Sequence, residues 1–207
     1  MAASSKRYRL NILEKIELEI DYNKTIDEQL DVLSNFDNIS DSEINFILQH
    51  GHKSSEVGIL IEYLGHDKLN AYLSKLLWFL ADMNWPAAYG TANMLLASKE
   101  KILPEIKRIF IYENDGMWNY WVLNCIISKW DLNLIKNIRP ELIHLIENDT
   151  NKFKDGVGIL ALKILYENNL VTDKEFEYYY KNLEKEYLSD IFEDWTNDLL
   201  DLKNASR

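Results

Sequence analysis

The chain has few of the residues that define several common protein classes. Among 207 residues there are one cysteine, Cys125, only 3 prolines and 7 glycines. A single cysteine excludes an internal disulfide framework and a zinc site built from cysteines. No apolar run reaches the ~18 residues that a membrane helix needs, and charges recur too early in the first twenty residues for a signal peptide. We therefore expect a cytoplasmic protein that does not associate with membranes.

The scarcity of glycine and proline also narrows the fold. A β-sandwich or a dinucleotide-binding α/β domain uses more turn residues than this chain contains. The glycine-rich motifs G-x-G-x-x-G and G-x-x-x-x-G-K-[ST], which cradle phosphates, are both absent. Apolar residues make up 47% and charged residues 28% of the chain, as in ordinary folded proteins. The composition predicts an all-α protein.

Helical periodicity recurs along the chain in short segments. Apolar residues return every three or four positions, as in Ile26, Leu30, Leu33 and Phe36. Capping boxes, in which a serine or threonine precedes a glutamate by three positions, predict helix starts at Thr25 with Glu28, Ser40 with Glu43, and Thr172 with Glu175.

These short segments predict antiparallel helix pairs joined by short loops, arranged as a single-domain, HEAT-like α-α superhelix. We expect N-terminal acidic helices over residues 1–68, packed on a HEAT-like core over 69–170, with C-terminal acidic helices over 171–207.

A Trp-Pro pair interrupts two apolar helical stretches near the middle of the chain. Proline disfavours helical geometry at the preceding Trp85, and Asn84 is a suitable N-cap. We therefore expect one helix to end near Asp82 and the next to run from about Pro86 to Ala97. Pro104 and Pro140 are likewise expected to begin helices.

Four stretches within about residues 69–168 resemble the bacterial family known as domain of unknown function 5071. They read LLWFLADMNWPAAYGTANMLL, ILPEIKRIFI, DGMWNYWVLNCII and IRPELIHLIEN. Most of the resemblance is carried by the spacing of Asp82, Asn84, Trp85, Pro86, Trp118, Tyr120 and Trp121. It implies a small HEAT-type helical domain with no assigned chemistry. It also implies a link to genes for secreted bacterial toxins, beside which small acidic helical proteins act as immunity factors.

The motif residues allow a structural and a functional interpretation. Trp118 and Trp121 share one helix face, which favours packing in the core; an exposed aromatic ridge at an interface is the alternative. Asp82 and Asn84 are interpreted as helix caps, or else as the polar mouth of a pocket. Trp85 either packs at the corner or contacts a ligand.

Negative charge is concentrated towards the two chain ends. The net charge is −11, with ten acidic residues and two lysines from Glu14 to Glu43, and ten acidic residues and three lysines from Asp173 to Asp201. Solvated helix faces that aid solubility are one interpretation, and a docking surface for a cationic partner is the other. The candidate partner contacts are Asp27, Glu28, Asp31, Asp190, Glu193, Asp194 and Asp198, with Trp195 as an anchor.

Catalytic and metal-binding patterns are missing from the sequence. The four histidines lack the spacing of zinc ligands, and Cys125 lies among apolar residues, where a thiol is usually inert. We expect no catalytic residue, no metal and no cofactor. The negative charge opposes nucleic acid as a partner.

Together with the resemblance, these features favour a non-catalytic immunity protein that binds a cognate basic toxin domain. A HEAT-type interaction scaffold and an enzyme with a small-molecule pocket near Asp82 are the alternatives.

Overall fold

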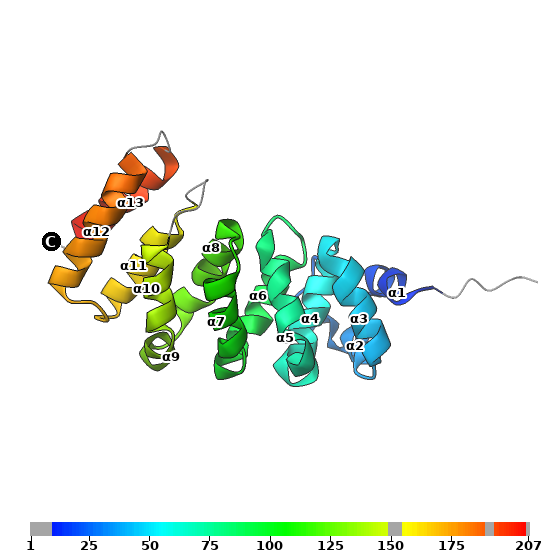
Figure 1. Cartoon of the computed structure of the whole chain (residues 1–207). Coiled ribbons are helices and arrows are strands. Elements are labelled where there is room, and N and C mark those ends of the chain that lie inside the picture. The colour runs from blue at the N-terminus through cyan, green and yellow to red at the C-terminus, as the bar shows by residue number, and fades with distance from the viewer. Residues whose placement is uncertain (1–9, 149–154, 189–192, 206–207) are drawn as a thin grey trace, which may run out of the picture.

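The computed structural model describes residues 10–148, 155–188 and 193–205. Within these ranges the chain forms helices and no β strand, which confirms the all-α prediction. The helices stand side by side in an elongated row, with α1 at one end and α12 and α13 at the other (Figure 1). Whether this row follows a HEAT-type superhelix stays a prediction.

The elements are mostly short helices separated by brief 3-10 turns. The α-helices are α1 Ile12–Glu19, α2 Leu30–Leu33, α3 Asp41–His50, α4 Ser55–Leu69, α5 Leu73–Leu77, α6 Ala88–Ala97, α7 Leu103–Tyr112, α8 Gly116–Cys125, α9 Leu132–Asn137, α10 Arg139–Glu147, α11 Val157–Glu167, α12 Asp173–Leu188 and α13 Glu193–Ala205. The 3-10 helices are η1 Asp27–Gln29, η2 Ser34–Phe36, η3 Gly51–Lys53, η4 Asn70–Tyr72, η5 Trp78–Ala81, η6 Lys99–Lys101 and η7 Ile127–Lys129.

The predicted capping residues start helices as expected. Ser40 and Glu43 form a reciprocal capping box at the start of α3, and Thr172 and Glu175 exchange hydrogen bonds at the start of α12. Thr25 and Glu28 also form their hydrogen bonds, but these precede the 3-10 helix η1 and not an α-helix. Two of the three predicted capping boxes therefore start α-helices, and the third precedes a 3-10 helix.

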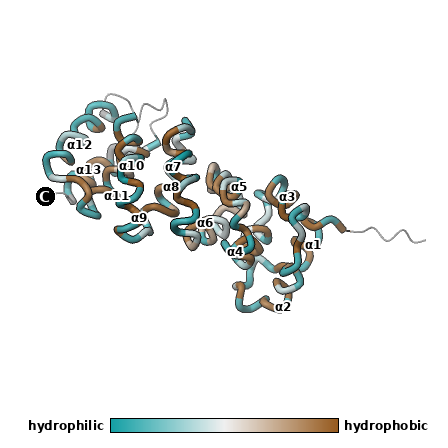
Figure 2. The backbone as a smooth tube through the Cα atoms, turned by 60° about the horizontal axis from the view of Figure 1, so that its bottom comes forward, coloured by the Kyte–Doolittle hydropathy of each residue, from teal (hydrophilic) through white to brown (hydrophobic). Residues whose placement is uncertain are grey.

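Neighbouring helices share one hydrophobic core along the row. Helix α4 packs against α6, α10 against α7 and α11, and α11 against α8, α12 and α13. Buried apolar residues form a cluster that extends from Ile16 in α1 to Leu202 in α13. Hydrophobic residues occur in helices along the whole row and are not confined to one part (Figure 2).

The corner at Trp85-Pro86 differs from the prediction. Helix α6 spans Ala88–Ala97, so it begins two residues after the predicted start and ends at the predicted residue, and Asn84 is not its N-cap. Instead, the Asn84 backbone N–H donates to the Asp82 carboxylate at 2.9 Å, and the Trp85 N–H donates to the Asp82 carbonyl at 3.0 Å. Asp82 thus stabilises a turn that contains Asn84 and Trp85, so the helix begins later than expected. Pro104 and Pro140 do lie in the first turns of α7 and α10.

Candidate functional site

The first group of predicted partner contacts lies at the N-terminal end of the row. Asp27 in η1 and Asp31 in α2 are exposed, and neither pairs with a lysine or arginine among the described residues. Glu28 is engaged locally, because its carboxylate accepts the N–H and the O–H of Thr25 at 2.8 and 2.9 Å. These hydrogen bonds hold the pKa of Glu28 below its usual value. Asp27 and Asp31 are thus open to a partner, whereas Glu28 caps a turn.

Large apolar side chains are exposed in the same part of the chain. Leu18 is 73%, Tyr22 61% and Leu30 47% exposed. The neighbouring Glu17 and Glu19 are exposed as well. The N-terminal end therefore offers apolar surface together with unpaired negative charge.

The second group of predicted contacts belongs to the C-terminal end. Asp190 lies outside the described residues, and for Glu193 and Asp194 only the helical backbone is described. Asp198 is exposed on α13 and forms no ion pair with a described residue. Trp195 is half-buried, so it serves the fold as well as any partner.

Trp195 seats α13 on two other helices. Its ring contacts the ring of Tyr120 on α8, with centroids 5.2 Å apart. It also covers Gly156 at the start of α11, where an added Cβ would lie only 2.6 Å from the ring. Gly156 has φ of +74°, which favours glycine, and its N–H donates to the Tyr187 hydroxyl at 3.1 Å. Trp195, predicted to anchor a partner, thus holds α13 against α8 and α11 within this molecule.

A hollow of about 420 Å³ opens where α8, α11 and α13 meet. Its wall includes the aromatic side chains of Tyr120 and Trp195. Its charged lining consists of Lys163, Glu167, Asp198 and Asp201, which are all exposed. This hollow, called the α13 hollow below, is of a size that holds one large side chain or a small ligand.

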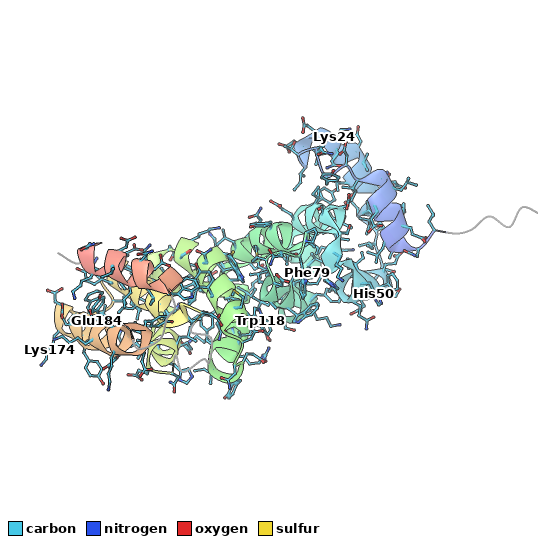
Figure 3. All side chains as sticks on the ribbon, turned by 90° about the horizontal axis from the view of Figure 1, so that it is seen from above. Lys24, His50, Phe79, Trp118, Lys174 and Glu184 are labelled. Carbon is cyan, nitrogen blue, oxygen red and sulfur yellow. The ribbon has the colours of Figure 1, made fainter. Side chains whose placement is uncertain are left out.

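The two acidic groups lie at opposite ends of the row. Figure 3 labels Lys24 near the N-terminal end, and Lys174 and Glu184 near the other end, with Phe79 and Trp118 between them. A single small partner domain therefore contacts one acidic end at a time. The sequence places both groups at the chain ends but does not reveal their separation in space.

Four acidic residues in the middle of the row form ion pairs within the molecule. Arg108 pairs with Glu105 at 3.3 Å and with Glu113 at 2.8 Å. Lys107 pairs with Glu141, and Lys101 with Asp67, each at 3.2 Å.

Some carboxylates of the C-terminal end are also paired. Glu175 pairs with Arg139 at 3.1 Å, and Glu184 with Lys203 at 3.3 Å. Among the candidate contacts whose side chains the structure describes, the carboxylates without a hydrogen-bond or ion-pair partner are thus Asp27 and Asp31 at one end and Asp198 at the other.

The motif residues of the central corner have structural partners. The Trp85 ring contacts Trp78, with centroids 4.5 Å apart, and His52, with centroids 4.6 Å apart. Pro86 is exposed in the turn that leads to α6. Neither Asp82 nor Trp85 lines the α13 hollow. Asp82 and Asn84 stabilise a turn, because the Asp82 carboxylate accepts hydrogen bonds from the backbone and the side-chain amide of Asn84.

Trp118 and Trp121 differ in how deeply they are buried. Trp118 is buried, and its indole N–H donates to the Leu77 carbonyl at the end of α5 at 2.8 Å, which confirms its predicted place in the core. Trp121 is only partly buried and contacts the ring of Tyr120, with centroids 5.2 Å apart. Trp118 therefore links α8 to the end of α5, while Trp121 contacts Tyr120 in the wall of the α13 hollow.

Sequence patterns do not reveal the roles of His52, Tyr120 and Gly156 in these sites. His52 joins the aromatic cluster of the corner, and its ring Nδ1 is buried without a partner among the described residues. Tyr120 and Gly156 receive Trp195 from a distant part of the chain. Only the positive φ of Gly156 could have been anticipated, because glycine favours this conformation.

The described residues show no arrangement typical of catalysis on metals or thiols. No group of three or more histidine, cysteine, aspartate or glutamate side chains within them is placed to hold a metal ion. Cys125 is buried, and burial raises the pKa of its thiol, which reduces its reactive thiolate fraction.

Comparison with models of protein families identifies the family of this chain. The model of the family described as Domain of unknown function (DUF5071) matches residues 46–165. The chain belongs to this family. The match starts at 46 and not near 69 as the resemblance indicated, so α4 and the corner's His52 lie within the DUF5071 region. A search of curated proteins and a search of solved structures each found no match.

The DUF5071 region contains the central corner, Trp118, Tyr120 and most of α11. The candidate partner contacts on described elements belong to η1, α2 and α13, which all lie outside it. No helix of the described residues combines the length and apolar character needed to cross a membrane.

Proposed function

We propose that this DUF5071 protein is a non-catalytic, cytoplasmic immunity protein that binds and neutralises a cognate basic toxin domain. The observation that supports this most directly is the set of exposed carboxylates, Asp27, Asp31 and Asp198, that no described lysine or arginine neutralises. A toxin that acts on nucleic acid needs a positive surface to bind phosphates. Carboxylates held on a rigid helical row complement such a surface and cover it.

The physical advantage of this arrangement is speed and selectivity of association. Complementary charges steer the encounter and raise the association rate, and like charges discourage wrong partners. Aromatic and apolar side chains near the carboxylates, such as Tyr22 and Trp195, supply the burial that slows dissociation. Each acidic end contains exposed carboxylates and aromatic or apolar side chains.

The test is binding to the toxin domain encoded beside this gene, measured by calorimetry with purified proteins. Charge reversal is made separately at the N-terminal end (Asp27→Lys with Asp31→Lys) and at the C-terminal end (Asp198→Lys). Glu100→Lys, at an exposed site in η6 in the middle of the row, is the matched control.

We expect one of the two end variants to bind at least ~10-fold more weakly, about 1.4 kcal/mol, with the control unchanged. Affinity of the wild-type protein should also fall as salt is raised. No binding to the toxin domain, or equal binding by all variants, refutes the proposal.

A HEAT-type interaction scaffold is the second candidate. The elongated row with exposed aromatic residues outside the acidic ends, such as Trp78 at 41% and Tyr89 at 66% exposure, favours it. Under this alternative, substitution of Trp78 or Tyr89 weakens partner binding, whereas charge reversal at the ends does not.

A further inference from the structure

We propose that the α13 hollow receives the side chain of an arginine from the basic partner. This inference rests on the proposed function and adds to it which end docks and which partner group is recognised. Three features of the hollow support an arginine as its occupant: the aromatic wall, the free polar groups and the net charge.

The aromatic wall provides a surface on which a planar cation can stack. Tyr120 and Trp195 come from α8 and α13 and contact each other at 5.2 Å between ring centroids. The Trp121 ring contacts the Tyr120 ring, and the close packing of Trp195 on Gly156 restrains the indole. A guanidinium over such rings gains cation–π attraction, which is strongest with tryptophan. The rings are held by the fold and need no ordering when a cation arrives.

Polar groups of the hollow are left free for a partner. The Tyr120 hydroxyl and the carboxylates of Asp198 and Asp201 form no hydrogen bond or ion pair with any described residue. Burial raises the pKa of the Tyr120 phenol, and the negative charge of Asp198 raises it further. Tyr120 and Asp198 both line the α13 hollow.

The charge of the lining favours a cation. Glu167, Asp198 and Asp201 contribute three negative charges, and Lys163 contributes one positive charge. Lys163 opposes any cation that enters, but the carboxylates outnumber it. The hollow is thus net negative as well as aromatic.

Arginine fits this combination better than lysine does. The guanidinium is planar, carries five N–H donors in a fixed fork, and binds carboxylates in a bidentate manner while its face stacks on a ring. An ammonium group is more strongly hydrated and presents no flat face. The α13 hollow combines aromatic rings with carboxylates at the C-terminal end, so this is the end that we expect to specify an arginine.

The probes for this test are ethylguanidinium chloride and butylammonium chloride at equal ionic strength. The indole N–H signals of the ¹⁵N-labelled protein report binding, and a Trp195→Phe variant assigns the Trp195 signal. We expect ethylguanidinium to shift the Trp195 signal saturably, butylammonium to bind at least ~3-fold more weakly, and the Trp85 signal to stay unchanged.

Two variants of opposite sign test the charged lining. Asp198→Asn with Asp201→Asn should weaken ethylguanidinium binding by ~10-fold or more, and Lys163→Gln should strengthen it. Asp173→Asn, an exposed carboxylate on α12 outside the hollow, is the matched control and should have no effect. Unsaturable shifts, equal binding of both cations, or unchanged binding by the Asp198→Asn, Asp201→Asn variant overturn the inference.

The same neutral variant in the toxin-binding assay separates this inference from the proposed function. Loss of toxin affinity at least as large as that for ethylguanidinium supports both. Unchanged toxin affinity overturns the arginine site and leaves the immunity function standing. If ethylguanidinium binds but the toxin domain does not bind the wild-type protein, the immunity function and the proposed source of the arginine both fail.

Discussion

Replacing Gly90 by alanine should destabilise the protein, because the added methyl group meets the backbone of a neighbouring helix. Gly90 in α6 crosses α4 at Gly58, and a Cβ at Gly90 would lie 2.2 Å from the Gly58 carbonyl oxygen and 2.5 Å from its carbonyl carbon. Both obstacles are backbone atoms, so no side-chain rotation relieves the overlap. The two helices must instead separate until the contact reaches about 3 Å or more.

The magnitude follows from two opposing terms. Overpacking of a core typically costs about 1–3 kcal/mol, and occasionally more. Exchange of glycine for alanine inside a helix gains about 1 kcal/mol. Because the obstruction is rigid backbone, the steric term should lie at the upper limit, which leaves a net loss of about 2 kcal/mol. With a typical dependence of stability on urea, the unfolding midpoint then falls by roughly 1 M.

Urea unfolding followed by far-UV circular dichroism and by tryptophan fluorescence measures this loss. Gly65→Ala is the control, since Gly65 has φ of +67° but no atom within 4 Å of an added Cβ. With ψ of 177°, Gly65 lies in a backbone region that is almost exclusive to glycine, so this variant should lose only the strain of that backbone, about 1–3 kcal/mol. If Gly90→Ala proves as stable as the wild-type protein, the close crossing of α4 and α6 is not the constraint that the geometry indicates.

Three further substitutions test other local features. Trp118→Phe removes the N–H that donates to the Leu77 carbonyl at 2.8 Å and should cost about 1–3 kcal/mol in urea unfolding, because it leaves a buried acceptor without this donor. Lys99 follows α6 with φ of +46°, so Lys99→Gly should stabilise the protein by about 1 kcal/mol; no gain in the unfolding midpoint would contradict this. Burial lowers the pKa of His52 from its usual 6.5, with Lys53 and His50 adding to the effect. The unfolded state then binds the proton first as pH falls, so stability should drop below about pH 6.5, and His52→Phe should flatten that dependence between pH 7 and pH 5.

The helix starts that the sequence predicts correctly are those set by local patterns. The capping box at Ser40 and the proline in the first turn of α7 act within four residues of a helix start, so the sequence alone reveals them. At Pro86 two local rules compete. The Asp82 side chain forms a turn with Asn84, and this turn delays α6 to Ala88, two residues beyond the predicted start.

The candidate site depends on contacts between residues far apart in the sequence, which no short pattern encodes. Tyr120, Gly156 and Trp195 come together only because α13 folds back over α8 and α11. The sequence predicts that Trp195 and Asp198 belong to one acidic segment, but it does not reveal the hollow beside them. Likewise, the hydrogen bond between Trp118 and Leu77 joins residues 41 positions apart.

The spatial separation of the acidic ends has a consequence for recognition. Each packed helix adds about 8–10 Å to the row, and charges in water are screened within ~8 Å at physiological salt. The two ends therefore act as independent electrostatic surfaces, although they lie on one protein with one net charge. Charge reversal at Asp27 and Asp31 should leave the affinity of a partner in the α13 hollow unchanged at physiological salt and alter it only at low ionic strength. Recognition then depends on which end pairs its carboxylates with a shaped aromatic surface, and the described residues show that pairing at Tyr120 and Trp195.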